Sequence, residues 1–378
     1  MIYFDGAATT LQKPDSVAKA MAAAVTNLAS PGRGGHKASM RAAEAAYLCR
    51  EAAAELFGVS DPERIVFTHN ATHALNIAIK SLVKTGDRVV ISGYEHNSVT
   101  RPLAAIGVKV TVARSALFCN ASVIRAFDEA LTLDTKLVVL NHVSNVFGSV
   151  LPVEGIAAMC KARRIPFILD ASQSAGVLDM RAEELGADFI AMPGHKGLYG
   201  PQGTGLLICK NLPVQTLIEG GTGSDTRHIA MPESLPDRLE AGTHNMPGIS
   251  GLLEGIRFVQ ARSAWILEHE RTLIEMLAKG LRRMPDVYLY KSSEAHRQTG
   301  VLSFRIADID CESIAEALGE QNIALRAGLH CAPLAHESAG TLETGTLRVS
   351  FSAFNTEREV DVFLRILAQM RKGLRKTE

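Results

Sequence analysis

The stretch Ala191-Met192-Pro193-Gly194-His195-Lys196-Gly197 decides the fold of this chain. It leads from an apolar, strand-like segment into a turn that carries a lysine, and the run Pro166-Phe167-Ile168-Leu169-Asp170 ends on an aspartate in the same way. A lysine that forms a Schiff base and a carboxylate that keeps a ring nitrogen protonated are the pair that pyridoxal phosphate requires. On its own, a Gly-His-Lys triplet after a strand is more often a surface turn, so the neighbouring sequence must decide.

Short β-rich runs alternate with longer helical patterns around this stretch. The β-rich runs cover residues 64–68, 88–92, 108–112, 137–140, 167–170, 189–192 and 205–209. The helical patterns cover residues 71–83, 98–106, 122–131 and 153–163. This alternation predicts an α/β fold with a mostly parallel sheet. Because the runs are uniformly apolar, we expect helices on both faces of the sheet.

The pattern changes after Gly248, where a long helical stretch, 251–284, has no intervening strand. It is followed by a strand, a helix, a strand and a terminal helix at residues 301–306, 311–320, 346–351 and 357–371. We therefore expect a large cofactor-binding α/β domain over residues 15–247. A smaller α+β domain would combine residues 1–14 with 248–378.

The composition of the chain indicates which kinds of molecule it is expected to bind. The formal net charge is zero, from 40 Lys+Arg and 40 Asp+Glu, so nothing broad attracts nucleic acid or an anionic membrane. No apolar run reaches membrane-spanning length, and the start, Met1-Ile2-Tyr3-Phe4-Asp5, lacks the basic region of a secretory signal. Six cysteines without a C-x-x-C pair argue against a disulfide framework. We expect a protein of the reducing cytoplasm whose partners are small molecules or proteins.

Polar residues follow five of the predicted strands. They are Asn70-Ala71-Thr72, Glu95-His96-Asn97, His142-Val143-Ser144-Asn145, Asp170-Ala171-Ser172-Gln173 and His195-Lys196. Each group alone has a structural reading as a helix cap, a surface histidine or a turn. In open α/β sheets, however, ligands bind beyond the carboxyl ends of the strands. Their joint position beside a lysine therefore favours one binding site.

Each group suits one part of the cofactor. A phosphate binds well at a helix N-terminus, here the helix that begins at Ala71. His96 can stack on the pyridine ring, while Asn145 and Gln173 can donate to its phenolic oxygen. Asp170 would keep the ring nitrogen protonated, which makes the ring an electron sink.

The chain resembles the class V, fold type I pyridoxal-phosphate enzymes, and more narrowly the cysteine desulfurases and selenocysteine lyases. Matches run from Tyr3-Phe4-Asp5-Gly6-Ala7-Ala8-Thr9-Thr10 to Phe354-Asn355-Thr356 and include Tyr199-Gly200-Pro201 and Glu240-Ala241-Gly242-Thr243. The resemblance implies a set of cofactor-binding residues: Ala71, Thr72, His96, Asn145, Asp170, Gln173, His195, Lys196 and Thr243. Among these, Thr72 and His195 would contact the phosphate. Thr243 would reach the phosphate of a neighbouring subunit, which implies a homodimer.

The narrower identification depends on the run Arg326-Ala327-Gly328-Leu329-His330-Cys331-Ala332-Pro333-Leu334. It is similar to the loop that carries the catalytic cysteine in cysteine desulfurases. A thiol on a glycine-containing loop beside a histidine and an arginine should ionise more readily than a buried thiol. We therefore expect Cys331 to be the nucleophile and the other five cysteines to be structural. A zinc site of His330, Cys331 and His336 lacks a fourth ligand at usual spacing, so no metal is expected.

Three residues are expected to bind the substrate. Arg348 resembles the family arginine that clamps the substrate carboxylate, a role that suits a planar fork of donors; the alternative is a sheet arginine paired with an acid. Arg326 begins the cysteine run, and His36, in Gly34-Gly35-His36, matches a family position near the catalytic cysteine.

Three positions depart from the family pattern. Pro193 stands where many relatives have a hydroxyl residue, so one phosphate contact is expected to be lost. Leu329 replaces a histidine that often precedes His330, and His244 replaces a proline that commonly follows Gly-Thr.

The sequence thus predicts an enzyme that takes sulfur from L-cysteine, leaves L-alanine, and holds a persulfide on Cys331 for transfer to an acceptor, which could be a protein. Lys196, Cys331 and His96 are the expected catalytic residues, with Lys196 moving protons on the substrate carbons. Two alternatives stay open. One is a selenocysteine lyase, and the other is a catalytically idle, cofactor-binding partner of sulfur-assembly machinery.

Overall fold

A seven-stranded sheet forms the centre of the larger part of the protein in the computed structural model, which describes residues 1–32, 34–210 and 214–374. The strands are β2 (Ile65–Thr68), β3 (Arg88–Ser92), β4 (Lys109–Ala113), β5 (Thr135–Asn141), β6 (Phe167–Asp170), β7 (Phe189–Pro193) and β8 (Gly205–Cys209). Their order is β2-β8-β7-β6-β5-β3-β4, and β8 is antiparallel to both of its neighbours while the other pairs are parallel. The predicted mostly parallel sheet is confirmed.

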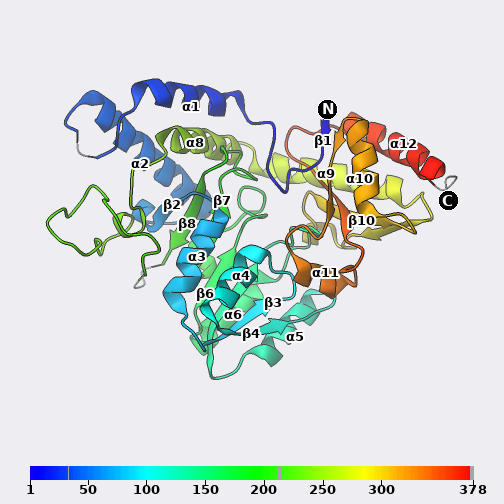
Figure 1. Cartoon of the computed structure of the whole chain (residues 1–378), viewed down its shortest axis with the longest axis horizontal. Helices are drawn as coiled ribbons and strands as arrows, with labels where there is room; N and C mark the ends of the chain where they lie inside the picture. The colour runs from blue at the N-terminus through cyan, green and yellow to red at the C-terminus, as the bar shows by residue number, and fades with distance from the viewer. Residues whose placement is uncertain (33, 211–213, 375–378) are drawn as a thin grey trace.

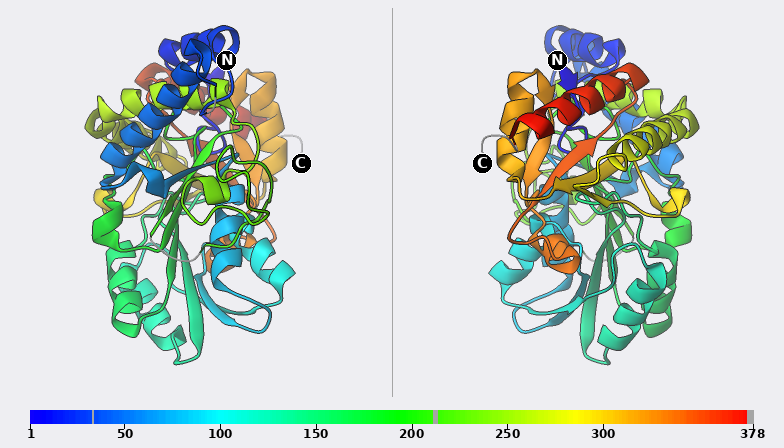
Figure 2. Two further views of the ribbon diagram at one scale, coloured as in Figure 1. Left: turned by 90° about the vertical axis from the view of Figure 1, so that its left-hand side faces the viewer. Right: turned by 90° about the vertical axis from the view of Figure 1, so that its right-hand side faces the viewer.

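Helices cover both faces of this sheet (Figures 1 and 2). One face packs against α3 (Ala71–Leu82) and α4 (Asn97–Ile106). The other face packs against α2 (Lys37–Phe57), α5 (Asn120–Ala130), α6 (Val153–Arg163), α7 (Ala182–Leu185) and α8 (Met246–Gln260). Helix α1 (Asp15–Asn27) lies on α8. Because both faces are buried, the strands need apolar side chains throughout, as the sequence pattern indicates.

A second sheet, β12-β13-β10-β9, belongs to the smaller part of the protein. Its antiparallel strands are β9 (Val287–Tyr290), β10 (Val301–Ile306), β12 (Arg326–Gly328) and β13 (Thr346–Ser350). The other elements of this part are α9 (Ser263–Leu281), α10 (Cys311–Glu320), α11 (Pro333–Ala339), α12 (Glu357–Leu374) and the paired short strands β1 (Ile2–Tyr3) and β11 (Ile323–Ala324). Side chains of α9, α10, α12 and β10 form a separate hydrophobic core with Phe4. No helix in the described ranges is long and apolar enough to cross a membrane.

The helical stretch 251–284 consists of two helices, α8 and α9, which are separated at Ala261 and Arg262. Helix α8 places Ile249, Leu252 and Ile256 in the core of the large sheet, whereas α9 packs in the second core. The expected boundary at residue 247 would assign α8 to the smaller domain. Since α8 packs on the large sheet, we propose that the two parts divide after Gln260.

The first residues of the chain are tied to strand β13. The Ser350 amide donates to the Phe4 carbonyl at 2.8 Å, and the Gly6 amide donates to the Ser350 carbonyl at 3.1 Å. A Cβ added at Gly6 would lie 2.8 Å from the Phe351 carbonyl oxygen. Only a residue without a side chain allows this close approach, and it holds residues 4–6 against the strand that carries Arg348.

Gly6→Ala should therefore destabilise the fold by about 1–3 kcal/mol, because the new methyl group must push two backbone segments apart. Gly319→Ala in α10 is the matched control, since a Cβ there meets nothing within 4 Å and alanine favours helix. We expect the control to be neutral or stabilising by up to about 1 kcal/mol. Urea unfolding followed by circular dichroism measures both variants, and equal midpoints would contradict the proposed close contact.

Candidate active site

A cavity of about 360 Å³ opens at the carboxyl ends of the parallel strands. Strands β2, β3, β5, β6 and β7 run in the same direction, so the segments that follow them meet at one edge of the sheet. The cavity is lined from three sources: residues 7–9, these strand ends, and the segment that contains Arg326, Cys331 and Arg348. The predicted convergence of the strand ends is thus present, and the smaller part of the protein completes the wall.

Lys196 follows β7 and lies in this cavity. Burial lowers the pKa of its amine to about 8, while Asp170 acts in the opposite direction and Arg348 lowers the pKa further. The backbone at Lys196 is fixed because the Tyr199 amide donates to its carbonyl at 2.9 Å. With a pKa of about 8, roughly a tenth of the Lys196 amine is neutral at pH 7, far more than for an unperturbed lysine with a pKa of about 10.4. The neutral form is the one that acts as a nucleophile or a base.

Asp170 and His96 lie beside this lysine. Asp170 ends β6, is buried, and lies within electrostatic range of both Lys196 and His96. It is not one of the residues that line the cavity. Its Oδ1 accepts a hydrogen bond from the Ser172 amide at 2.9 Å. His96 lines the cavity and caps α4 through Nδ1, which accepts from the Ser98 amide at 3.0 Å. Burial lowers the pKa of His96, so its ring is neutral and can lie against an aromatic ring.

One end of the cavity suits a phosphate. Asn70 caps α3 by accepting from the His73 amide at 2.9 Å, and the preceding amides of the first turn, at Ala71 and Thr72, line the cavity. His195 also lines it, and burial lowers the pKa of its ring to about 4. The buried Nδ1 of His195 has no hydrogen-bond partner in the described part of the chain. The Asn70 side chain bonds the His73 amide and not those of Ala71 and Thr72, so this helix start, with the unused ring nitrogen of His195 nearby, fits a bound phosphate.

The two amides expected at the phenolic oxygen are engaged elsewhere. Asn145 lines the cavity, but its Nδ2 donates to the His330 carbonyl at 2.8 Å, and its buried Oδ1 has no partner among the described residues. Gln173 donates from Nε2 to the Ala7 carbonyl at 2.9 Å and lines a smaller adjoining cavity that also reaches Lys196. Each amide retains a second N–H, so the predicted contacts stay predictions.

Cys331 is exposed at the cavity, on a loop with an unusual backbone. His330 and Cys331 both have positive φ, 49° and 56°, a region that residues with a Cβ rarely adopt. The loop is fixed at two carbonyls, because the Asn97 amide donates to Cys331 at 2.8 Å and Asn145 donates to His330. The large sheet therefore holds the loop that presents the thiol.

His330 corrects one expectation about this thiol. Its ring is buried, and its Nε2 lies 3.1 Å from both the carbonyl and the hydroxyl of Thr346. Burial lowers the pKa of His330 well below its ordinary range, and the nearby Arg348 lowers it further. The ring is therefore neutral and supplies no positive charge to Cys331. The positive charge near the thiol belongs to the arginines.

The other cysteines differ from Cys331. Cys49, Cys160, Cys209 and Cys311 are buried. Burial raises the pKa of Cys49 and Cys160 to about 12, so these thiols stay protonated. Cys119 is exposed but precedes α5 and does not line the cavity.

The two arginines that are predicted to bind the substrate both form ion pairs with the carboxylate of Asp5. The sequence alone assigns no role to Asp5. Arg348 is 2% exposed and donates to Asp5 Oδ1 at 2.7 Å and to the Asn145 carbonyl at 3.0 Å. Arg326 donates to Asp5 Oδ2 at 3.0 Å. Asp5 stands in the matched N-terminal run, but nothing in the spacing of the sequence pairs it with residues more than 300 positions away.

Comparison with known proteins identifies the family. The model of the family "Aminotransferase class-V" matches residues 2–363. The chain belongs to this family. A probable cysteine desulfurase of Pyrococcus abyssi is 32% identical over 392 residues, covering all of this chain and 96% of the relative. A similar protein of Mycolicibacterium paratuberculosis is 33% identical, and there the chain spans only 56% of the relative's length.

Solved structures agree with the fold. The apo structure of a cysteine desulfurase from Thermococcus onnurineus NA1 has a TM-score of 0.89 at 30% identity, covering 98% of this chain and 95% of that one. The cysteine desulfurase CsdA of Escherichia coli gives a TM-score of 0.84 at 25% identity, with coverage of 98% and 94%. The fold type I architecture is thereby confirmed. Pyridoxal 5'-phosphate is the cofactor of class V enzymes, and the groups at this cavity fit it.

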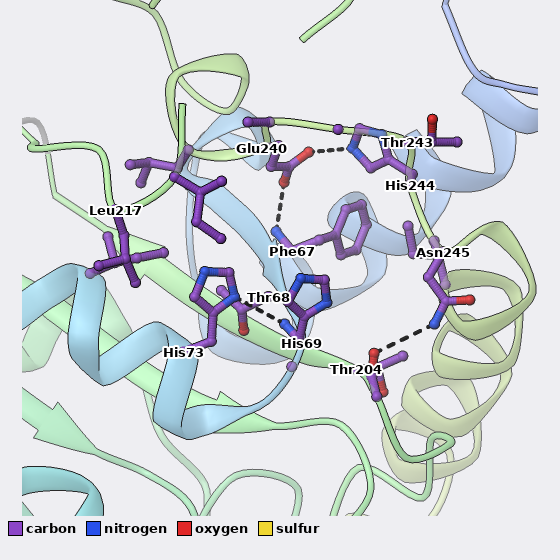
Figure 3. Close-up of a pocket in the computed structure, with 18 residues that line it drawn as sticks. Phe67, Thr68, His69, His73, Thr204, Leu217, Glu240, Thr243, His244 and Asn245 are labelled. Atoms are coloured by element: carbon purple, nitrogen blue, oxygen red, sulfur yellow. Dashed lines mark hydrogen bonds and ion pairs between the residues drawn. The ribbon is translucent and has the colours of Figure 1, made fainter. Parts of the chain in front are cut away.

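Two predicted site residues of this class V enzyme lie away from the cavity in the single chain. His36 is exposed and caps α2. In Figure 1, α2 lies on the left and α11, the helix that follows Cys331, lies on the right. Thr243 is exposed beside a smaller pocket of about 80 Å³, together with His69 and His73 (Figure 3). The single chain therefore does not bring either residue to Lys196.

The departure at His244 has a structural reason. His244 Nε2 lies 2.6 Å from Oε2 of Glu240, whose carboxylate also accepts from the Phe67 amide (Figure 3). The same carboxylate forms a buried ion pair with Arg50. Burial would raise the pKa of Glu240, but its bonds with His244 and Arg50 lower it overall. A proline at position 244 could not make this contact.

The lowered pKa of Lys196 predicts a pH dependence. In cofactor-free protein, acetic anhydride should acetylate Lys196 at a rate that rises with a midpoint near pH 8, because only the neutral amine reacts. An unperturbed lysine has a pKa of about 10.4. Peptide mapping by mass spectrometry measures the rate for Lys196 and for exposed lysines in the same sample. A midpoint for Lys196 at pH 10 or above would contradict the burial argument.

Proposed function

We propose that this chain is a pyridoxal-phosphate-dependent cysteine desulfurase, which converts L-cysteine to L-alanine and receives the sulfur as a persulfide on Cys331. One observation carries the proposal. A single cavity contains a buried amine of lowered pKa, at Lys196, and an exposed thiol, at Cys331. The full-length similarity to proteins named cysteine desulfurase supports the same activity.

The bound cofactor supplies an electron sink for the substrate's α-carbon. Ala71, Thr72 and His195 would hold its phosphate, His96 its ring face and Asp170 its ring nitrogen. Asn145 and Gln173 would use their second N–H groups for its phenolic oxygen. Lys196 anchors it, and the neutral amine then removes the proton from the substrate Cα and returns one later.

Cys331 performs the sulfur step. Its thiolate attacks the substrate sulfur, an S–S bond forms, and the C–S bond breaks. The electron pair of the broken bond stays on the carbon skeleton, which becomes alanine after proton uptake. The thiolate is thereby converted to a persulfide.

The arginines orient the substrate for this attack. Arg348 would bind the α-carboxylate, since its buried Nε has no partner among the described residues and its guanidinium lines the cavity. Arg326 lines the same cavity as Arg348 and Cys331, and Arg348 lies within electrostatic range of the Cys331 sulfur.

The exposure of Cys331 supports transfer of the sulfur to an acceptor, including a protein, that approaches from solvent. The six free cysteines support a reducing compartment, and we propose the cytoplasm.

We also propose a homodimer. Thr243 and His36 are predicted site residues that lie away from the cavity containing Lys196, and both are exposed. In a homodimer each could reach the cavity of the other subunit, Thr243 at the phosphate and His36 near Cys331.

Cys331→Ala should reduce sulfide release from L-cysteine by roughly a hundredfold or more, because among the described residues no other cysteine lines the cavity. The visible absorbance of the bound cofactor should remain, since Lys196 is untouched. Cys119→Ala is the matched control, as this thiol is equally free and exposed but lies outside the cavity, and its activity should match the unmodified protein. Sulfide and alanine are assayed together with a reductant. Full activity of Cys331→Ala would refute the role of the thiol.

Thr243→Ala should weaken cofactor binding about tenfold, because a hydrogen bond to a charged phosphate is lost. Thr222→Ala, in the same loop region, should leave cofactor affinity unchanged. Fluorescence titration of cofactor-free protein measures both, and light scattering gives the molar mass. A monomeric protein, or equal affinities for the two variants, would contradict the shared site.

A further inference from the structure

The carboxylate of Asp5 lies between the two arginines of the active site. Its Oδ1 accepts from Arg348 at 2.7 Å and its Oδ2 from Arg326 at 3.0 Å. Asp5 is 8% exposed, so water competes little for these bonds. Both ion pairs are direct, and both arginines line the cavity that contains Lys196 and Cys331.

The Asp5 backbone is held in place. Asp5 forms a bridge with Ser350 on β13, the strand that also carries Arg348. The amide of Ala7 donates to the Ser350 hydroxyl at 2.9 Å, and the Tyr3 hydroxyl donates to the Thr9 carbonyl at 2.9 Å. The backbone that carries the carboxylate is therefore fixed beside the strand of Arg348.

Charge balance follows from this arrangement. Two guanidinium groups and one carboxylate leave one net positive charge at this wall of the cavity. One positive charge matches a ligand with a single α-carboxylate. Burial lowers the pKa of Arg348 from its ordinary value and Asp5 opposes that effect, so the carboxylate also helps keep this buried cation charged.

Arg348 and Arg326 differ in exposure and therefore in the groups of a ligand that each can contact. Arg348 is almost fully buried and holds the Asn145 carbonyl as well as Asp5. The side chain of Arg326 is 47% exposed and lies on the strand that leads into the Cys331 loop. A substrate must bring its side chain toward Cys331, so a negative charge on that side chain would meet Arg326 if Asp5 did not neutralise it.

We propose that Asp5 determines substrate specificity: by neutralising Arg326 and orienting Arg348, it makes the site select amino acids with one carboxylate and an uncharged side chain over those with an anionic side chain. The inference rests on the proposed function in one respect, the binding of the substrate α-carboxylate by Arg348. It names a role for a residue that neither holds the cofactor nor takes the sulfur.

The test compares L-aspartate with L-asparagine, which have nearly the same shape and differ in side-chain charge. Isothermal titration calorimetry of the holoenzyme gives the dissociation constant of each, without any sulfur release. Asp5→Asn should lower the ratio of the constants, aspartate over asparagine, about tenfold, because Arg326 becomes free to bind the second carboxylate. Asp5→Glu keeps the charge and should keep the ratio near that of the unmodified enzyme.

The double variant Asp5→Asn/Arg326→Gln should return the ratio to within about twofold of the unmodified value. An unchanged ratio in Asp5→Asn would overturn the proposal, because a purely structural role affects both ligands alike. Should Asp5→Asn fail to fold, Arg326→Gln alone still decides: the proposal requires it to raise the ratio by threefold or more, and no change refutes it. A protein that passes these tests but yields no alanine from cysteine would disprove the desulfurase activity and leave the charge selection standing.

Discussion

The direction of the strands is the constraint on which the site depends. Six strands run the same way, and the residues that follow five of them meet at one edge of the sheet. The apolar sequence forms the strands, and the polar residues after them line the cavity. Strand β8 runs the other way, and none of the predicted site residues follows it. Strand β8 begins at Gly205, at the same edge of the sheet. The chain therefore re-enters the sheet there after the turn that contains Lys196.

Burial and neighbouring charges have opposing effects on the pKa of the catalytic amine at this edge of the sheet. Burial makes the Lys196 amine easier to deprotonate, and Asp170 limits that change. The same burial keeps the rings of His96, His195 and His330 neutral. These histidines therefore act as hydrogen-bonding and packing groups, and the mobile protons at the site belong to Lys196 and the substrate.

The sequence predicted what depends on local pattern. Apolar runs located the strands of the large sheet, and the residues after them located Lys196, Asp170 and His96 at one edge. Long-range packing was not predictable. Nothing in the local sequence indicates that Asp5 would meet Arg326 and Arg348, that His330 would be buried against Thr346, or that α8 would pack with the large sheet. The role of a residue that acts across subunits, as we propose for Thr243, follows neither from the local sequence pattern nor from the structure of one chain.

The cavity joins the two parts of the protein, and the contacts across it explain why both are needed. Cys331 belongs to the smaller part, yet its carbonyl is held by Asn97 and that of His330 by Asn145, both from strand ends of the large sheet. Arg348 in turn donates to the carbonyl of Asn145. The group proposed to bind the carboxylate and the loop that carries the thiol are therefore connected through one asparagine. This connection fixes the position of the thiol relative to the carboxylate site, while the sulfur atom itself stays exposed for transfer.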